Sequence, residues 1–128
     1  MQCLPYTNHD YDIPFFIPKD KFLTLFDQSD FMRREYQEVR HEYRSDWFIE
    51  TTCSEVYFIL PIVQFINKRT QFINGRHRTA VLLNYLDFIP LALVHPFGMD
   101  QYFLNQIINR PIKIKDLIDL PNLPILEE

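Results

Sequence analysis

Glycine is the residue that this chain lacks most clearly, because its 128 residues include only Gly75 and Gly98. An average usage of about 7% would give roughly nine. Few positions are then free to take a positive φ, so we expect each glycine to have a specific task in the backbone. Gly98 is expected only to interrupt the chain before a helix that Asp100 caps. Gly75 lies inside a basic motif and is the more informative of the two.

Cysteine and long apolar runs are also scarce. Cys3 and Cys53 are the only thiols and form no Cys-x-x-Cys pair, so neither a disulfide framework nor a cysteine zinc site is expected. The four histidines have no metal-ligand spacing, and we expect no bound metal from them. The longest apolar runs are too short to span a membrane, and no signal peptide is predicted. We therefore expect a cytoplasmic protein without a membrane partner.

Acidic residues are missing from one long segment, which runs from Val56 to Leu86 and contains one lysine and three arginines. The whole chain has 13 basic and 17 acidic residues and a formal net charge of −4. This acidic balance disfavours a general nucleic-acid-binding surface. A basic segment in an acidic protein instead indicates one local anion site. Nucleic acid is accordingly expected only as the substrate of a nuclease.

The chain contains enough apolar material for one core, since 47% of its residues are hydrophobic and 16% are aromatic. The alternation of short strand and helix patterns predicts a single α+β domain over residues 1–128. We divide it into an N-terminal strand and charged helix (1–55), a phosphate-binding core (56–96) and C-terminal helices (97–128). A further short helix is expected at 113–120.

The N-terminal part is predicted to contain a strand at 13–18, a short helical turn at 22–26 and then a longer helix. The longer helix is expected to begin at Ser29 or Asp30 and to end near Arg44. Its apolar stripe consists of Met32, Tyr36, Val39 and Tyr43. We expect its charged residues, including Glu35, to form a face exposed to solvent.

The chemistry is concentrated in the motif FINGRHRTA at 72–80. A hairpin strand is predicted to end at Asn74, Gly75 turns the chain, and a helix follows to about Leu86. The first amides of a helix have no partners in the helix, and the helix dipole is positive there, so this point is suited to bind phosphate. Arg76 and Arg78 can bind phosphate oxygens. Basic residues at this end destabilise a helix unless something negative compensates them, and the sequence offers no acidic neighbour.

Other members of the motif have secondary roles in this interpretation. His77 can donate a hydrogen bond or act as an acid or base near neutral pH, and the hydroxyl of Thr79 can add a donor. Asn74 is expected to cap the helix or to reach a phosphate, and we favour capping. The alternative interpretation is that Gly75 only turns the chain and that the arginines are exposed to solvent.

Three segments together resemble the ParB/sulfiredoxin superfamily: PIVQFI (61–66), FINGRHRTA (72–80) and IPLAL (89–93). Members of that superfamily typically have a similar strand, a hairpin, a G-x-x-R box that opens a helix, and a following strand. The resemblance implies a small mixed sheet with a β-hairpin–helix–strand core and flanking helices. It also implies that Gly75, Arg76, His77 and Arg78 contact the phosphates of ATP or another nucleoside triphosphate, usually with Mg²⁺.

The chain departs from two branches of this superfamily. Sulfiredoxins have their nucleophilic cysteine between the Gly and the His of the box, where this chain has Arg76, so sulfiredoxin chemistry is not expected. Chromosome-segregation ParB proteins have a Glu after the Gly and carry further domains for which this chain has no room. The resemblance is therefore to a stand-alone domain, of a kind reported among ATPases, kinases, nucleases and plasmid-borne inhibitors.

Two classes of function remain open at this stage. The first is an NTPase, phosphotransferase or nuclease in which His77 is the acid or base. Such an enzyme needs a carboxylate from outside the acid-free segment, and Glu50 is our choice over Asp46 and Asp20. The second is a non-catalytic regulator or inhibitor of plasmid or phage type, which binds a phosphorylated small molecule or a protein partner.

Overall fold

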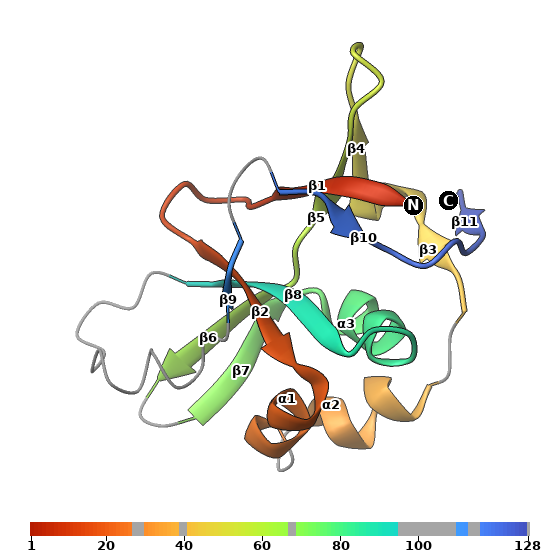
Figure 1. Cartoon of the computed structure of the whole chain (residues 1–128). Helices are drawn as coiled ribbons and strands as arrows, with labels where there is room; N and C mark the ends of the chain where they lie inside the picture. The colour runs from red at the N-terminus through yellow and green to blue at the C-terminus, as the bar shows by residue number, and fades with distance from the viewer. Residues whose placement is uncertain (27–29, 39–40, 67–68, 95–109, 113–115, 128) are drawn as a thin grey trace.

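The computed structural model describes residues 1–26, 30–38, 41–66, 69–94, 110–112 and 116–127, and these form a mixed α+β fold (Figure 1). The larger sheet has five strands in the order β7-β6-β8-β2-β9. Their bounds are Arg69–Asn74 for β7, Ile62–Ile66 for β6, Phe88–Leu93 for β8, Ile13–Pro18 for β2 and Arg110–Pro111 for β9. β6 and β7 form an antiparallel hairpin, and β6 is parallel to β8. The α+β fold class is confirmed.

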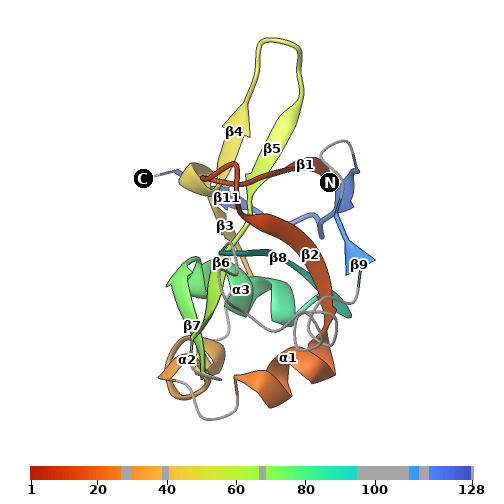
Figure 2. The ribbon, with the colours of Figure 1, turned by 90° about the vertical axis from the view of Figure 1, so that its left-hand side faces the viewer.

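A second sheet has four strands in the order β10-β1-β5-β4. Their bounds are Ile118–Asp119 for β10, Gln2–Tyr6 for β1, Val56–Ile59 for β5 and Phe48–Glu50 for β4. A small two-stranded sheet pairs β3 (Tyr43–Arg44) with β11 (Ile125–Leu126). The hairpin of β4 and β5 projects from the rest of the molecule, and residues 51–55 at its tip are all exposed (Figure 2).

The chain passes from one sheet to the other at Leu60 and Pro61. The Leu60 N–H donates to the carbonyl of Tyr6 in β1 (3.0 Å), and the Pro61 carbonyl accepts from Ala92 in β8 (2.8 Å). Proline has no N–H and cannot continue a ladder on both sides. The mostly apolar segment from 56 to 66 is therefore two strands in two sheets, although its sequence pattern is nearly continuous.

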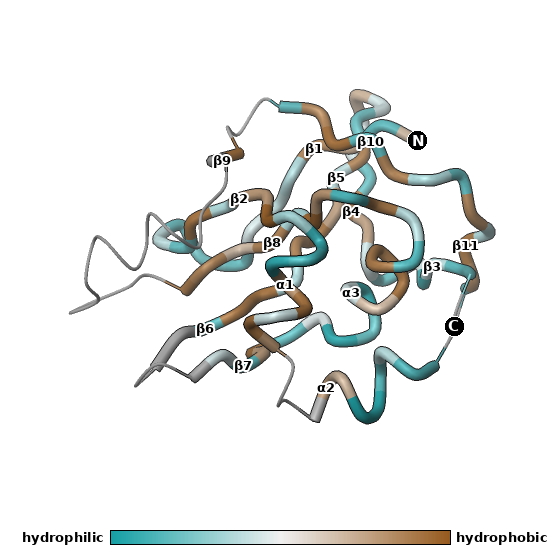
Figure 3. The backbone as a smooth tube through the Cα atoms, turned by 60° about the horizontal axis from the view of Figure 1, so that its bottom comes forward, coloured by the Kyte–Doolittle hydropathy of each residue, from teal (hydrophilic) through white to brown (hydrophobic). Residues whose placement is uncertain are grey.

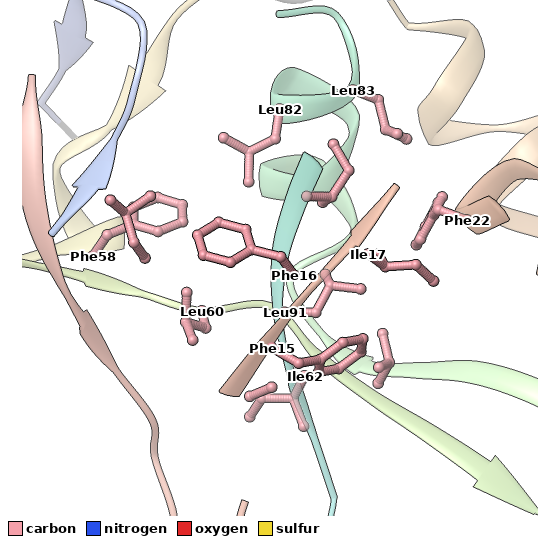
Figure 4. Close-up of a cluster of buried hydrophobic side chains, with 14 of the residues drawn as sticks. Phe15, Phe16, Ile17, Phe22, Phe58, Leu60, Ile62, Leu82, Leu83 and Leu91 are labelled. Carbon is pink, nitrogen blue, oxygen red and sulfur yellow. The ribbon is translucent and has the colours of Figure 1, made fainter. Parts of the chain in front are cut away.

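The core lies between the two sheets and the helix α3 (Arg76–Leu83). Figure 4 shows side chains from β2, β5, β8 and α3 facing one another in this space. Residues 79–83 of α3 are all buried, so this helix is covered on every side and not only on one face. Strand β8 consists largely of hydrophobic residues, whereas the segment around α2 (Asp30–Arg33) is largely hydrophilic (Figure 3).

The predicted helix from Asp30 to Arg44 is wrong. Between α1 (Lys19–Leu25) and β4, the described chain has the short helix α2, a 3₁₀ turn η1 at Glu35–Gln37, strand β3 and a second 3₁₀ turn η2 at Ser45–Trp47. Tyr43 is fully buried, and its N–H and hydroxyl bind the carbonyls of Pro124 and Pro121. These tertiary contacts outweigh the helical spacing of the apolar residues.

Two more expectations need correction or lie outside the described residues. Residues 118–119 form strand β10 against β1 and not the helix expected at 113–120, and β1 itself was not predicted. The expected helix after Gly98 and the residue Ser29 lie outside the described residues. In the part of the chain that is described, no helix is long and apolar enough to cross a membrane.

Candidate anion site at the start of α3

Gly75 has a positive φ, as we expected from the scarcity of glycine in this chain. Its φ is +95°, in the left-handed region that side chains other than glycine rarely adopt. A Cβ at this position would lie 2.6 Å from both Cα and Cβ of Pro61 and 2.9 Å from Nη2 of Arg78. Glycine is therefore required for the turn, for contact with the crossover between the sheets and for the room that the Arg78 guanidinium occupies.

Helix α3 begins directly after this turn. The first intrahelical bond runs from the N–H of Thr79 to the carbonyl of Gly75 (3.0 Å). The amides of Arg76, His77 and Arg78 precede that bond and have no carbonyl one turn earlier to bind. Gly75 is the N-cap residue, and no side chain caps the helix. Asn74 therefore does not cap α3, contrary to our expectation, and the helix start is left open.

A cavity of about 340 Å³ lies at this helix start. Its wall combines the end of β7, the first turn of α3, the end of β5, the turn η2 and the loop after β1. The lining residues are Asn8, Asp46, Trp47, Ile59, Ile73, Asn74, Gly75, Arg76, His77 and Arg78. Elements from both larger sheets thus meet around the motif that the sequence singled out.

Arg78 is the most deeply placed charged group of the cavity wall, since only 5% of the residue is exposed. Its Nη1 donates to the carbonyl of Ile59 at 2.7 Å. Burial lowers the pKa of Arg78 to about 10, which the charge of Asp46 partly opposes, and the group is protonated at neutral pH. Among the described residues, no carboxylate makes an ion pair with it. A buried cation with one neutral partner can accept an anion from the cavity.

Arg76 has a different environment, because its Nε lies 2.9 Å from Oε1 of Glu35. The contact is close but poorly directed: Nε and Nη2 of Arg76 and Oε2 of Glu35 are buried without a hydrogen-bond partner in the described chain. Burial alone would raise the pKa of Glu35, but the Arg76 guanidinium, a backbone hydrogen bond of Glu35 and the charge of Arg34 together outweigh this effect, so the net pKa is lowered. The compensating acid for the helix start is therefore Glu35, far upstream in the sequence.

The expectation that Glu35 belongs to a solvated face is wrong, because only 6% of it is exposed. It follows Phe31, fully buried, by four positions, and both face the interior from the segment around α2 and η1. The Arg76 guanidinium also lies 6.0 Å from the ring centre of Phe72 in β7. The charged segment thus contacts one residue of the cavity wall, Arg76, and is not a free surface.

The structure brings most of the predicted site residues together. Asn74 and His77 are exposed and line the cavity beside Gly75 and the two arginines. Thr79 does not line it: its buried hydroxyl donates to the Gly75 carbonyl at 2.8 Å.

The expected carboxylate, Glu50, is also outside the cavity wall. It is exposed at the end of β4, where it pairs with Val56. Of the two alternatives, Asp46 lines the cavity and Asp20 does not. Sequence reasoning also passed over Asn8, Trp47 and Ile59 as site residues.

The described residues contain no cluster of three or more His, Cys, Asp or Glu side chains that could hold a metal ion. Compared with known proteins, the chain matches no family model, no curated protein and no solved structure at a significant level.

Proposed function

We propose that this chain is a phosphate-binding domain that recognises the phosphate of a nucleotide, such as ATP, or of another phosphorylated ligand in the cavity at the start of α3. The observation that carries the proposal is Arg78, a guanidinium 5% exposed that faces a cavity without a carboxylate partner of its own among the described residues. Burying a charge without an ionic partner is unfavourable. An anion in the cavity offsets that penalty.

Backbone and side chains contribute together to this proposed binding. The open amides at 76–78 and the positive end of the helix dipole favour an anion in front of α3. Arg78 donates from its free edge, while the Ile59 carbonyl fixes its other edge. His77 and Asn74, both exposed at the rim, supply further donors. Trp47, Ile59 and Ile73 give the same cavity an apolar side that suits the organic part of a phosphorylated ligand.

The proposal includes a ParB/sulfiredoxin-like fold for the central unit. Its support is the order of elements: hairpin β6–β7, Gly75, helix α3 and strand β8, with β8 parallel to β6. This is the order that the resemblance of the three sequence segments implied.

Hydrolysis or transfer of the bound phosphate is supported by two further residues. His77 and Asp46 come from different elements and line the same cavity. A histidine near a phosphate can donate a proton to a leaving oxygen, and a carboxylate can orient an attacking water. Mg²⁺ is usually held by one or two carboxylates together with substrate phosphates, so Asp46 fits as its protein ligand beside a phosphate. That ion supplies charge neutralisation when it is bound.

The test is calorimetric titration of inorganic phosphate and of ATP with Mg²⁺ into the wild-type chain and into Arg78→Gln. Arg33→Gln is the matched control, because Arg33 is exposed on α2 and its replacement changes the net charge equally. We expect Arg78→Gln to weaken binding at least about tenfold, as expected for a lost charge-assisted contact. Arg33→Gln is expected to leave the affinity within about twofold.

Equal affinities in wild type and Arg78→Gln, or no binding of either ligand by a folded wild type, would overturn the proposal. Thermal unfolding of each variant separates a lost contact from a lost fold. Release of phosphate from ATP and nicking of DNA are measured in parallel. Turnover that requires Asp46 or His77 supports an enzyme, whereas Arg78-dependent binding without turnover supports a regulatory module or inhibitor.

A further inference from the structure

The pair of Glu35 and Arg76 gives the cavity a property that the basic motif alone does not suggest. Glu35 approaches Arg76 from η1, and only 8% of its side chain is exposed, against 34% for Arg76. The carboxylate is therefore shielded from water, and its charge acts strongly on the Arg76 side chain, whose Nε lies 2.9 Å from Oε1 of Glu35. Solvent and salt screen such a buried charge much less than an exposed one.

The charges around the cavity are balanced. Arg76, Arg78, His77 and Asp46 are the titratable residues of the wall. Glu35 does not line the cavity, but its carboxylate contacts Arg76 and adds a second negative charge beside the two guanidinium groups. The partial positive charge of the helix start is then the main uncompensated contribution. A phosphate with about one negative charge matches this balance, whereas each additional negative charge gains little net attraction, because repulsion by the carboxylates offsets attraction by the arginines.

We infer that Glu35 is a specificity-determining residue, which limits the amount of negative charge that the anion site accepts by neutralising Arg76. The inference rests on the proposed phosphate-binding function and adds to it a preference for phosphate groups of low net charge. Such groups occur in a phosphodiester and in a polyphosphate whose charge a cation already neutralises. Glu35 itself need not touch the ligand, because its effect is carried by Arg76 and by its own field.

The competing explanation is that Glu35 only holds the fold together. Both explanations predict some loss of stability when Glu35 is replaced, so stability does not separate them. A purely structural residue has no reason to change how affinity depends on the charge of the ligand. A residue that sets the charge of the site changes that dependence in a defined direction.

The experiment compares the affinity of orthophosphate, pyrophosphate and tripolyphosphate, without metal, for wild type, Glu35→Gln and Glu38→Gln. Glu38 is the matched control, because it is exposed just after η1 and its replacement changes the net charge equally. Glutamine keeps an acceptor for Arg76 and removes only the charge. Relative to the control, we expect Glu35→Gln to bind orthophosphate about threefold more tightly and tripolyphosphate at least about tenfold more tightly.

A double variant, Glu35→Gln with Arg76→Gln, restores the original charge balance and is expected to return the three affinities to the wild-type pattern. Glu35→Ala is measured beside Glu35→Gln, so that a variant that folds poorly does not decide the matter. Equal shifts in Glu35→Gln and Glu38→Gln for all three anions, or a loss of affinity in both Glu35 variants, overturns the inference. Binding that Arg78→Gln leaves unchanged instead overturns the proposed function on which it rests.

Discussion

Arg76 and Arg78 lie in the same turn of α3 and both line the cavity, but they differ in burial and in their partners. On one side, Arg76 is about one-third exposed and lies against the carboxylate of Glu35. On the other side, Arg78 is buried and has a backbone carbonyl as its partner. The charge of the first arginine is thus largely neutralised by the protein, and the charge of the second remains available to a ligand. Counting arginines in a motif therefore overstates the positive charge that a ligand meets.

The largest effect is expected from Gly75→Ala, because this change disturbs both sides at once. The new Cβ would meet Pro61 and the Arg78 guanidinium, and alanine is strained at a φ of +95°. We expect the free energy of unfolding to fall by about 3 kcal/mol or more, as measured by urea denaturation. Ile73→Ala, an exposed change at the same rim, is the control and should lose less than about 1 kcal/mol. A Gly75→Ala variant as stable as this control would show that the backbone relaxes easily.

Replacing Glu35 and Arg76 one at a time tests whether the loss of one partner lowers the free energy of unfolding more than the loss of the other. Arg76→Met leaves a carboxylate buried without its cation and should lower the free energy of unfolding by about 2–3 kcal/mol. Glu35→Gln leaves a cation that can turn toward solvent and should lower it by only about 1 kcal/mol. The double variant should lose clearly less than the sum of the two, which is the signature of coupling. Strict additivity would mean that the contact contributes nothing to stability.

A pH series sharpens the same comparison, because the pKa of Glu35 is lowered in the folded state from an ordinary value of 4.5. The contribution of Glu35 to stability is complete above that ordinary value and is lost as the pH falls through the lowered one. The difference in unfolding free energy between wild type and Glu35→Gln should therefore be constant from about pH 7 to pH 5 and should shrink in more acidic solution. Chemical denaturation at several pH values measures it, and a difference that grows on acidification contradicts the ion pair.

The smallest effect is expected on the Arg78 side from Asp46→Asn. Asp46 is exposed, and its charge acts on Arg78 without an ion pair between the described groups. Its removal should raise the affinity for orthophosphate by about two- to threefold and change stability by less than about 0.5 kcal/mol. Calorimetry and thermal unfolding measure the two quantities. A loss of phosphate affinity would instead indicate that Asp46 orients a neighbouring group.

The central unit could be predicted from the sequence because its signals are local. Gly75 ends one strand and begins a helix, the polar residues before it mark a hairpin, and the strand at 88–93 is a short apolar run. Each of these patterns depends on a few consecutive residues. The motif at 72–80 therefore located the start of the helix. In the structure, six consecutive residues of this motif, at 73–78, line the same cavity.

The rest depends on contacts between distant segments. The spacing of Met32, Tyr36 and Tyr43 fits a helix as well as it fits the observed turns, and only burial of Tyr43 against the C-terminal segment decides between them. In the same way, nothing local indicates that Glu35 faces inward. Nor does the sequence indicate that a short turn, η2, precedes β4 and places Asp46 in the cavity wall, whereas Glu50 lies outside that wall.

The contact between Gly75 and Pro61 has a consequence for how such a chain can evolve. Pro61 cannot withdraw from Gly75, because its carbonyl is bound by Ala92 in the neighbouring strand. A larger residue at position 75 thus demands a rebuilt connection between the two sheets as well as a new turn. Positions 61 and 75 are expected to be inherited as a unit, so covariation between them in a collection of related sequences would mark the lineages that retain this cavity.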